Sequence, residues 1–226
     1  MTLLGDASAF TRPGQFAEIA LPGRFLRRPI SVCRITDKGF TIIYRVVGAG
    51  TKDMSCMLPG TALDVLTGLG NGYDVSKAGE NPLLVGGGCG CPPLLELAAH
   101  LLAEGRQVQA VLGFNTVDEI FLADELAALG ASVTVTTVDG SVGQKGMVTD
   151  AMANMSFSDF FACGPLPMLR AICSATDRPG QLSLEARMGC GFGACVGCTI
   201  ETARGPRRVC KDGPVFDRAD VLWDKL

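Results

Sequence analysis

The chain has 226 residues, a formal net charge of −3 and no basic run, so a nucleic acid is not an expected partner. Its 47% hydrophobic and 19% charged residues suffice for a sizeable core, and no apolar stretch reaches the roughly 18 residues of a membrane span. The amino terminus lacks the basic region of a signal peptide. This predicts a cytoplasmic protein whose 10 cysteines are metal ligands or free thiols rather than disulfides.

Residues 1–78 carry the pattern of short β-strands separated by glycine turns. We expect strands at 16–21, 30–35 and 40–47, with Asp37-Lys38-Gly39 as the hairpin turn between the last two. Short strands of this kind are typical of a small antiparallel β-barrel.

Two polar clusters interrupt these strands, Arg28-Pro29-Ile30-Ser31 and Gly48-Ala49-Gly50-Thr51, and the second leads into a predicted short helix. A guanidinium beside a rigid proline turn and the backbone N–H groups of a glycine loop can together hold a diphosphate. Taken singly, each sequence is more often an ordinary turn.

Residues 79–178 change to alternating strands and helices with short links, which predicts a doubly wound parallel α/β sheet. The helix after the first strand has prolines in its first turn, where proline is tolerated. The expected strands are 83–85, 108–114, 132–138 and 159–163, and the expected helices are 94–102, 117–129, 147–152 and 167–175.

Two loops fall at the carboxyl ends of these strands. Gly86-Gly87-Gly88 follows the first strand, and Cys163-Gly164-Pro165 closes the last. Ligands of doubly wound sheets bind at this edge, and a glycine loop before a helix suits a pyrophosphate. The glycine loop is not a strict G-x-G-x-x-G match, so by itself it does not specify a dinucleotide.

Residues 179–226 contain Cys190, Cys195 and Cys198 at C-x4-C-x2-C spacing, with Cys210 twelve positions after the third. This is the plant-type spacing of [2Fe–2S] ligands. Interleaved glycines let the backbone curl around a cluster and direct N–H groups at its sulfurs. The pattern therefore favours a [2Fe–2S] cluster held by these four thiolates.

Two alternatives stay open for the four cysteines. A structural zinc site also takes four thiolates, although its usual spacing is two C-x2-C pairs, and the cysteines can also be unligated core thiols. The tail around them, with a strand at 196–201, a turn at 204–208 and a return at 209–211, is too short for its own core. We expect a bound cluster to stabilise it.

The remaining residues predict no acid–base catalysis, because no Ser/His/Asp set is evident. The single histidine, His100, lies in a predicted helix without a partner nearby and is interpreted as a solvated helix residue. Five further cysteines are interpreted as ordinary buried thiols: Cys33, Cys56, Cys89, Cys91 and Cys173.

The order of these parts resembles that of the ferredoxin-reductase-like electron-transfer subunits. Among them it is most similar to the iron–sulfur flavoprotein subunits of class 1B, NAD-linked dihydroorotate dehydrogenases. The resemblance covers nearly the whole chain. It is carried by residues 13–16, 28–31, 44–48, 63–66, 69–72, 145–146 and 149–150 and by the cysteine loop.

The resemblance implies an FAD-binding β-barrel at 1–78, an NAD-binding α/β domain at 79–178 and a [2Fe–2S] module at 179–226. It places Arg28 at the FAD diphosphate, Ser31 near the flavin ring and Gly50 and Thr51 at phosphate. The implied ligand sets are Arg28, Pro29, Ile30, Ser31, Ile43, Tyr44, Arg45, Gly50 and Thr51 for FAD, with Ile43 to Arg45 along its ribityl and adenine side; Gly86, Gly87, Gly88, Cys163, Gly164 and Pro165 for NAD; and Cys190, Cys195, Cys198 and Cys210 for the cluster.

The resemblance also implies a relay in pyrimidine biosynthesis. Electrons would run from dihydroorotate through an FMN-containing catalytic subunit, the cluster and FAD to NAD+, in a heterotetramer of two chains of each kind. An NAD(P)H-linked reductase subunit of a hydrogenase, sulfhydrogenase or ferredoxin system is a rival interpretation. A zinc-stabilised regulator that binds a nucleotide is a rival of another class.

Three local features qualify the resemblance. Only about fifteen residues precede Phe16, so a barrel strand is expected to be missing or supplied by a partner. Thr67-Gly68 stands where the family usually has Gly-Pro. Asp139, after the strand 132–138, predicts NAD(H) over NADP(H) because a carboxylate would repel a 2′-phosphate, although aspartate there can equally cap a turn.

Overall fold

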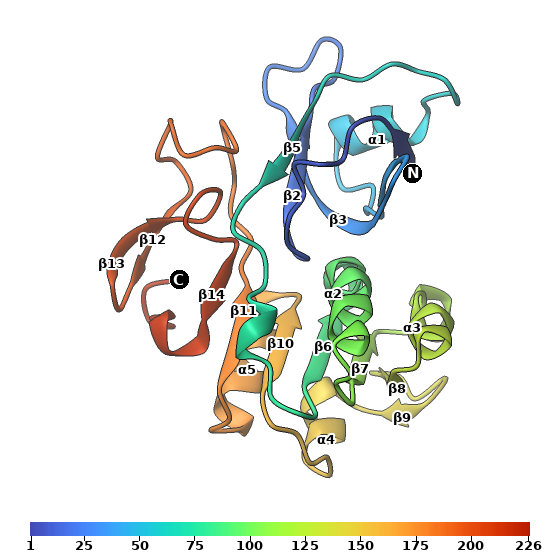
Figure 1. Ribbon diagram of the computed structural model, residues 1–226, viewed down its shortest axis with the longest axis vertical. Coiled ribbons are helices and arrows are strands. Elements are labelled where there is room, and N and C mark those ends of the chain that lie inside the picture. Colours follow the sequence, from blue (N-terminus) through green and yellow to red (C-terminus); the bar gives the residue numbers. More distant parts are fainter.

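The structure is a computed structural model that describes residues 1–226. An antiparallel five-stranded sheet, with α1 (Ala49–Ser55) against it, forms the amino-terminal lobe at the top of Figure 1. Its core contains Ala17, Ile19 and Phe40, together with Met54 of α1. In spatial order the strands are β1 (Thr2–Leu4), β4 (Gly39–Ile42), β3 (Arg28–Thr36), β2 (Phe16–Ile19) and β5 (Val65–Leu69).

The expected strand at 40–47 is too long, because β4 ends at Ile42. Ile42 is the last β4 residue paired with β3, opposite Val32. From there the chain leaves the sheet toward α1, so residues 43–47 have no neighbouring strand with which to pair. β1, which the sequence did not predict, pairs antiparallel with β4 at the sheet edge.

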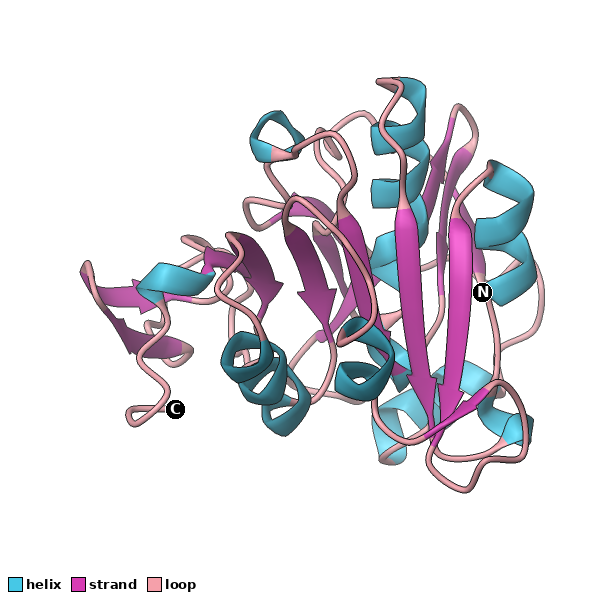
Figure 2. Cartoon of the chain, turned by 90° about the horizontal axis from the view of Figure 1, so that it is seen from below, coloured by secondary structure: helices cyan, strands magenta, loops and turns pink.

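The second lobe is built on a seven-stranded sheet whose strands are parallel except for β14. β6 is buried along its whole length because helices cover both faces of the sheet (Figure 2). In spatial order the strands are β14 (Val215–Asp217), β11 (Gly180–Ser183), β10 (Phe160–Cys163), β6 (Leu83–Gly87), β7 (Gln109–Phe114), β8 (Ser132–Thr137) and β9 (Gln144–Lys145).

The two faces of this sheet bury different helices. α2 (Pro92–Ala103) and α3 (Ala123–Leu129) pack with one buried cluster, and α4 (Val148–Met152) and α5 (Leu166–Ala175) pack with the other. This arrangement is the doubly wound sheet expected from the alternating pattern. No helix is both long enough and apolar enough to span a membrane. The short 3₁₀ helices are η1 (Val75–Lys77), η2 (Gly88–Gly90), η3 (Val117–Glu119) and η4 (Arg218–Asp220).

The expected helix at 117–129 is divided into η3 and α3. Between them Phe121 packs edge-to-face on Phe114, with 5.6 Å between ring centroids, and Leu122 takes the left-handed φ of 64°. Burial of these apolar side chains against β7 therefore outweighs continuation of the helix.

The carboxyl-terminal region is inserted into the sheet rather than appended to it. β11 and β14 are neighbouring strands of the large sheet, and the cysteine loop lies in the chain between them. The hairpin of β12 (Thr199–Thr202) and β13 (Gly205–Arg208) turns at 203–204, earlier than expected, and residues 209–211 form turns rather than the return strand. The Thr202 hydroxyl fixes the hairpin turn by donating to the Gly205 carbonyl over 2.7 Å.

Candidate functional site

Arg28 and Gly50 meet where β3 begins and α1 begins. The Arg28 Nη1 donates to the carbonyl of Leu26 over 2.6 Å, which holds the guanidinium on the loop before β3. A Cβ at Gly50 would collide with the Arg28 guanidinium, so only glycine allows this approach. The structure thus brings together two of the residues predicted to bind a diphosphate.

Thr51 is buried, and its hydroxyl is used inside the loop. It accepts from the N–H groups of Val47 (3.0 Å) and Gly48 (3.2 Å) and donates to the Gly48 carbonyl. The first N–H groups of a helix have no intrahelical partner. The backbone of Gly50 and Thr51, rather than the threonine hydroxyl, is therefore what this turn offers a phosphate.

The segment 43–45 turns from the barrel to the second lobe. Ile43 packs against the core under α2, and Arg45 pairs with Glu119 of η3 at 3.0 Å. Tyr44 packs against the barrel core instead. Pro29 and Ser31, which lie opposite residues of β2 in the β2–β3 ladder, are half-buried, as is Ile30 between them.

The two loops predicted to bind NAD lie side by side, because Cys163 of β10 is in register with Gly86 of β6. Both loops are packed too tightly for side chains. A Cβ at Gly86 would lie 2.8 Å from the Cys91 sulfur, and one at Gly87 or Gly164 would lie 2.5 Å from Met168 of α5. Together with Gly88, which has a φ of 50°, these glycines leave only backbone at this part of the carboxyl edge of the sheet, as a pyrophosphate site requires.

The thiols near this edge differ in exposure. Burial raises the pKa of Cys91 and of Cys163, so both are held as neutral thiols. Cys89 and Cys56 are exposed, which contradicts their interpretation as buried thiols. Their flanking residues, glycine in one case and a helix end in the other, leave the side chain uncovered.

His100 is exposed on α2, as expected of a solvated helix residue, but the expectation that it has no partner nearby is wrong. Its Nε2 lies 3.3 Å from the Glu96 carboxylate one helical turn earlier, so it does have a partner. The other oxygen of Glu96 accepts from the Ile35 N–H of β3 over 3.1 Å, which ties α2 to the barrel. This pair supports the packing of the two lobes.

The cysteine loop arranges its thiols in two pairs. The Cys190 sulfur accepts from the N–H groups of Ala194 (3.2 Å) and Cys195 (3.4 Å). The Cys198 sulfur accepts from the N–H of Cys210 over 3.4 Å. No three ligand-type side chains surround a common point as one metal ion requires. Two pairs suit the two irons of a [2Fe–2S] cluster, and N–H···S bonds of this kind tune such clusters.

The electrostatics of the pairs differ. Burial opposes ionisation of Cys190, but N–H groups of Cys195 and Phe192 outweigh it and lower the pKa of Cys190. Burial and the neighbouring Cys198 raise the pKa of Cys210. Cys190 is thus already poised as a thiolate ligand.

Sequence reasoning missed Glu18 of β2. It is 1% exposed, and neither carboxylate oxygen has a hydrogen-bond partner. Burial raises its pKa to about 7, although Arg27 and Arg28 oppose this. A charged residue inside the otherwise apolar run 16–21 was the available signal.

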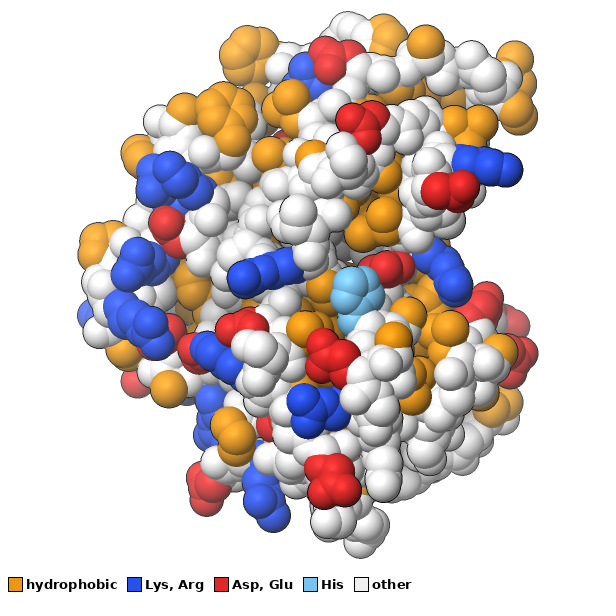
Figure 3. Space-filling view, in the orientation of Figure 1, with side chains coloured by type: hydrophobic (Ala, Val, Ile, Leu, Met, Phe, Trp, Pro, Cys, Tyr) orange, Lys and Arg blue, Asp and Glu red, His pale blue; other side chains and the backbone are white.

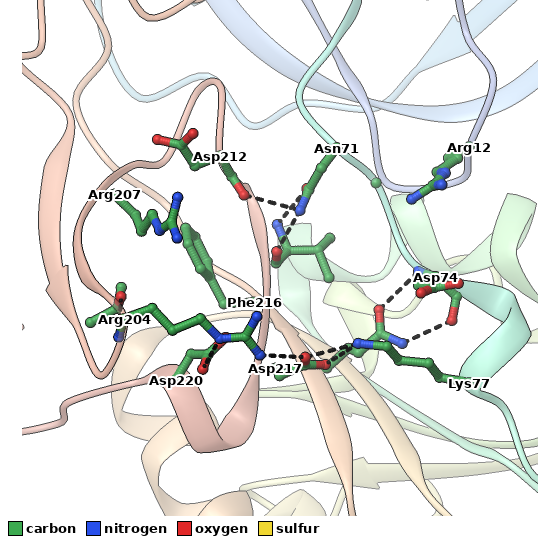
Figure 4. A pocket seen from close by; sticks show the side chains of 14 residues that line it. Arg12, Asn71, Asp74, Lys77, Arg204, Arg207, Asp212, Phe216, Asp217 and Asp220 are labelled. Atoms are coloured by element: carbon green, nitrogen blue, oxygen red, sulfur yellow. Dashed lines mark hydrogen bonds and ion pairs between the residues drawn. The ribbon is translucent and has the colours of Figure 1, made fainter.

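A polar pocket of about 330 Å³ lies away from these groups, at the junction of the two lobes and the carboxyl-terminal hairpin. None of the residues predicted to bind FAD, NAD or the cluster lines it. Figure 4 shows Arg204 directed at Asp217 and Asp220, with Lys77 on the other side of Asp217. We interpret the pocket as a charged contact between the two lobes and the β12–β13 hairpin rather than as a cofactor site.

Basic side chains gather at the edge of the molecule that the β12–β13 hairpin occupies, as the space-filling view shows (Figure 3). Arg204, Arg207 and Arg208 all belong to this hairpin or its turn. The same view shows a hollow between the two lobes on the opposite side.

The fold and the three groups of residues define an NAD-binding oxidoreductase with an iron–sulfur module. Residues 84–174 match the model of the oxidoreductase NAD-binding domain, and residues 185–222 match the iron–sulfur cluster binding domain of dihydroorotate dehydrogenase B. The chain is 46% identical to the dihydroorotate dehydrogenase B (NAD(+)) electron transfer subunit of Fusobacterium nucleatum, over 92% of this chain and 86% of that one. The counterpart in Bacillus pumilus is 44% identical over 98% and 91%. The chain belongs to this family of electron transfer subunits.

Solved structures agree with the fold. The structure of an NADH-dependent reduced ferredoxin–NADP oxidoreductase is similar with a TM-score of 0.88 and 34% identity, over 96% of this chain and 82% of that one. A flavohemoglobin of Malassezia yamatoensis with bound FAD and heme shares the fold at a TM-score of 0.62 and 19% identity, over 74% and 48%. The expected family, fold class and oxidoreductase character are confirmed.

Proposed function

We propose that the chain is the electron transfer subunit of an NAD+-linked dihydroorotate dehydrogenase, acting in pyrimidine (UMP) biosynthesis. Electrons from an FMN-containing catalytic subunit would pass through the [2Fe–2S] cluster and FAD to NAD+. The observation that carries the proposal is the paired arrangement of Cys190 with Cys195 and of Cys198 with Cys210. These pairs lie within a region that matches the cluster domain of the named enzyme.

Each cofactor has a part of this chain to hold it. Arg28 and the start of α1 offer a guanidinium and free N–H groups for the FAD diphosphate, and the absence of a Cβ at Gly50 leaves them adjacent. The loops 86–88 and 163–165 offer backbone for the NAD pyrophosphate. When bound, the flavin exchanges hydride with the nicotinamide and single electrons with the cluster.

Dihydroorotate oxidation belongs to a partner chain in this proposal. His100 pairs with Glu96, whose other carboxylate oxygen accepts from the Ile35 N–H of the barrel, so this pair serves packing in the proposal. The catalytic partner would join as a heterotetramer of two chains of each kind, as the family resemblance implies. The cytoplasmic location expected from the sequence stays a prediction.

The test is reconstitution with the dihydroorotate-oxidising chain encoded in the same genome. The purified pair should carry flavin and [2Fe–2S] absorption and should reduce NAD+ with dihydroorotate. This chain alone should reduce artificial dyes with NADH but should not oxidise dihydroorotate. A colourless protein, or a complex that oxidises dihydroorotate without reducing NAD+, would contradict the proposal.

A reductase subunit of a ferredoxin–NADP system is a second candidate. It is favoured by the 0.88 TM-score to the NADH-dependent reduced ferredoxin–NADP oxidoreductase. The two candidates share the cofactors and differ in the partner. Co-purification from the native organism decides between them, since the first requires a dihydroorotate-oxidising chain and the second a ferredoxin-reducing one.

A further inference from the structure

Glu18 lies where the FAD-binding strands meet the cysteine loop. Its strand, β2, is paired with β3, and Glu18 stands directly opposite Pro29, one position after Arg28. On its other side the Glu18 side chain abuts Gly191, the residue after Cys190. In Figure 1 the orange loop with the cysteines passes beside β2 and β5.

The local backbone directs the Glu18 side chain toward that loop. The β2–β5 pairing shifts register between Phe16 and Glu18, and such irregularities re-aim side chains in sheets near functional sites. Phe16, on the same face, packs in the core that contains Cys198 and Cys210. The face of β2 with Phe16 and Glu18 is therefore directed toward the cluster module, while Ala17 and Ile19 pack in the barrel core.

The contact leaves no spare volume. Gly191 has a φ of 78°, and a Cβ there would lie 2.5 Å from Cγ and 2.6 Å from Oε1 of Glu18. Glu18 is 1% exposed, so its side chain cannot swing out into solvent to make room. Both oxygens lack a partner, which is an unfavourable placement for a carboxyl group and calls for a role at this position.

We propose that Glu18 is a positioning residue that sets the placement of the cluster loop against the FAD strands, and thereby the rate of electron transfer between flavin and cluster. The side chain acts as a spacer of fixed size. It extends from β2, which is paired with the strand β3 that holds the proposed FAD contacts, and it abuts Gly191, which is bonded to Cys190 of the cluster loop. The inference rests on the proposed flavin and cluster, but not on the identity of the catalytic partner.

The experiment uses the full chain with both cofactors and no partner. NADH is mixed with the protein, and bleaching of flavin and of cluster are followed separately by stopped-flow absorbance. Iron, sulfide and FAD contents and the EPR spectrum of the dithionite-reduced cluster are measured beside the rates. If the wild-type chain holds no flavin or cluster, the proposed function itself fails, which separates that outcome from failure of Glu18.

Glu18→Ala should keep both cofactors and normal flavin bleaching but slow cluster reduction several-fold, because the rate of electron transfer falls as the distance between flavin and cluster grows. Glu18→Gln keeps the size of the side chain and should stay within about twofold of wild type. If Glu18→Gln is as slow as Glu18→Ala, charge or a proton matters rather than position, and the proposal is wrong.

Gly191→Ala drives a methyl group into Glu18 and should lower cluster content or slow cluster reduction. Gly205→Ala is the matched control: it has a similar φ of 87° in the same module, but its Cβ would meet nothing within 4 Å. The double variant Glu18→Ala/Gly191→Ala makes room for the methyl and should recover at least part of the loss. Equal behaviour of the two glycine variants, or no recovery in the double variant, would overturn the proposal.

Discussion

Arg28 shows how a side chain used by the fold can still be available to the proposed ligand. Its guanidinium donates to the Leu26 and Arg27 carbonyls, so it closes the turn that begins β3. It also lies on Gly50 at the start of α1. The turn interpretation and the diphosphate interpretation of this arginine are therefore compatible, because each nitrogen of the planar group can serve a different acceptor.

Replacing Arg28 by alanine should weaken FAD binding more than folding. A charge-assisted hydrogen bond to the diphosphate contributes about 1.5–3 kcal/mol, or roughly tenfold to a hundredfold in affinity. Quenching of flavin fluorescence on titration of FAD into the apoprotein measures this. Arg24→Ala is the control, since Arg24 pairs with Asp53 on the same lobe at 2.7 Å, whereas the side chain nearest to Gly50 is that of Arg28. Equal affinities for the two variants would leave Arg28 as a turn residue only.

Asp139 shows the same double use at the end of β8. Its carboxylate accepts from the Ser141 hydroxyl (2.7 Å) and N–H (2.9 Å), so it does cap a turn. These bonds hold the pKa of Asp139 below its usual range, with the hydroxyl the larger cause. The group is therefore ionised at neutral pH, and it would repel a 2′-phosphate placed beside it.

We expect a higher kcat/KM for NADH than for NADPH in reduction of an artificial acceptor. Asp139→Asn should narrow that preference, because it removes the charge while keeping an oxygen for the turn. Asp124→Asn on the exposed face of α3 should leave the ratio unchanged. A ratio at or below one in the wild-type protein would show that this loop does not select the dinucleotide.

At the scale of elements, the sequence predicted strands and helices where hydrophobic periodicity is strong. β6, β7 and β10 are largely buried and apolar, and β8 is rich in the β-branched residues valine and threonine, so their existence and order were evident. β11 was missed because Leu182 is its only large apolar side chain, and its burial comes from pairing with β10. The break before α3 was missed because it depends on the contact of Phe121 with Phe114, a tertiary effect.

In the candidate site, too, features set by local sequence could be predicted, and features set by tertiary contacts could not. The four cysteines predicted to be cluster ligands could be picked out by their spacing alone, since a cluster imposes a fixed local geometry on its loop. The charge of Glu18 within an apolar run was a signal of an unusual position, but the role proposed for it depends on contact with Gly191, which is remote in sequence. That the Thr51 hydroxyl bonds within its own turn could likewise not be predicted from the sequence.

The Cys195→Ser variant tests whether the paired cysteines of this loop are the cluster ligands. The variant should lose the [2Fe–2S] EPR signal and its iron, because serine is a poor substitute for a thiolate and Cys190 would lack its neighbour. FAD should stay bound and should still be bleached by NADH, since the barrel does not include the loop. Cys56→Ser, an exposed thiol on the barrel, is the control. A normal cluster spectrum in Cys195→Ser would refute the ligand assignment.

At the scale of the whole molecule, the cluster module is held by the sheet as well as by its own loop. Cys198, Val209 and Cys210 share a buried core with Leu182 and Phe216 of β11 and β14. From the sequence we expected a bound cluster to stabilise this tail. The structure shows that packing against the large sheet also buries it. The linker between the lobes is attached to the same module, since the Asn71 N–H donates to the Gly213 carbonyl over 2.7 Å.

Asn71 is the centre of this joint, as Figure 4 shows. Its Nδ2 donates to the carbonyls of Val215 (2.7 Å) and Asp212 (3.1 Å), and its Oδ1 accepts from the Val215 N–H over 3.1 Å. One side chain thus satisfies backbone groups that otherwise would be left unpaired between the lobes. Its removal affects the linker, β14 and the segment after Cys210 together.

Asn71→Ala should lower the free energy of unfolding by roughly 1.5–4.5 kcal/mol, because three hydrogen bonds of about 0.5–1.5 kcal/mol each are lost. Urea unfolding of the cofactor-loaded protein measures the change. Asn81→Ala is the control: Asn81 donates one bond, to the Ser156 carbonyl, within the second lobe alone. If the joint couples the lobes, FAD release and cluster loss should coincide in wild type and separate in Asn71→Ala. Equal stability of the two variants, with coincident transitions in both, would show that Asn71 does not join the lobes.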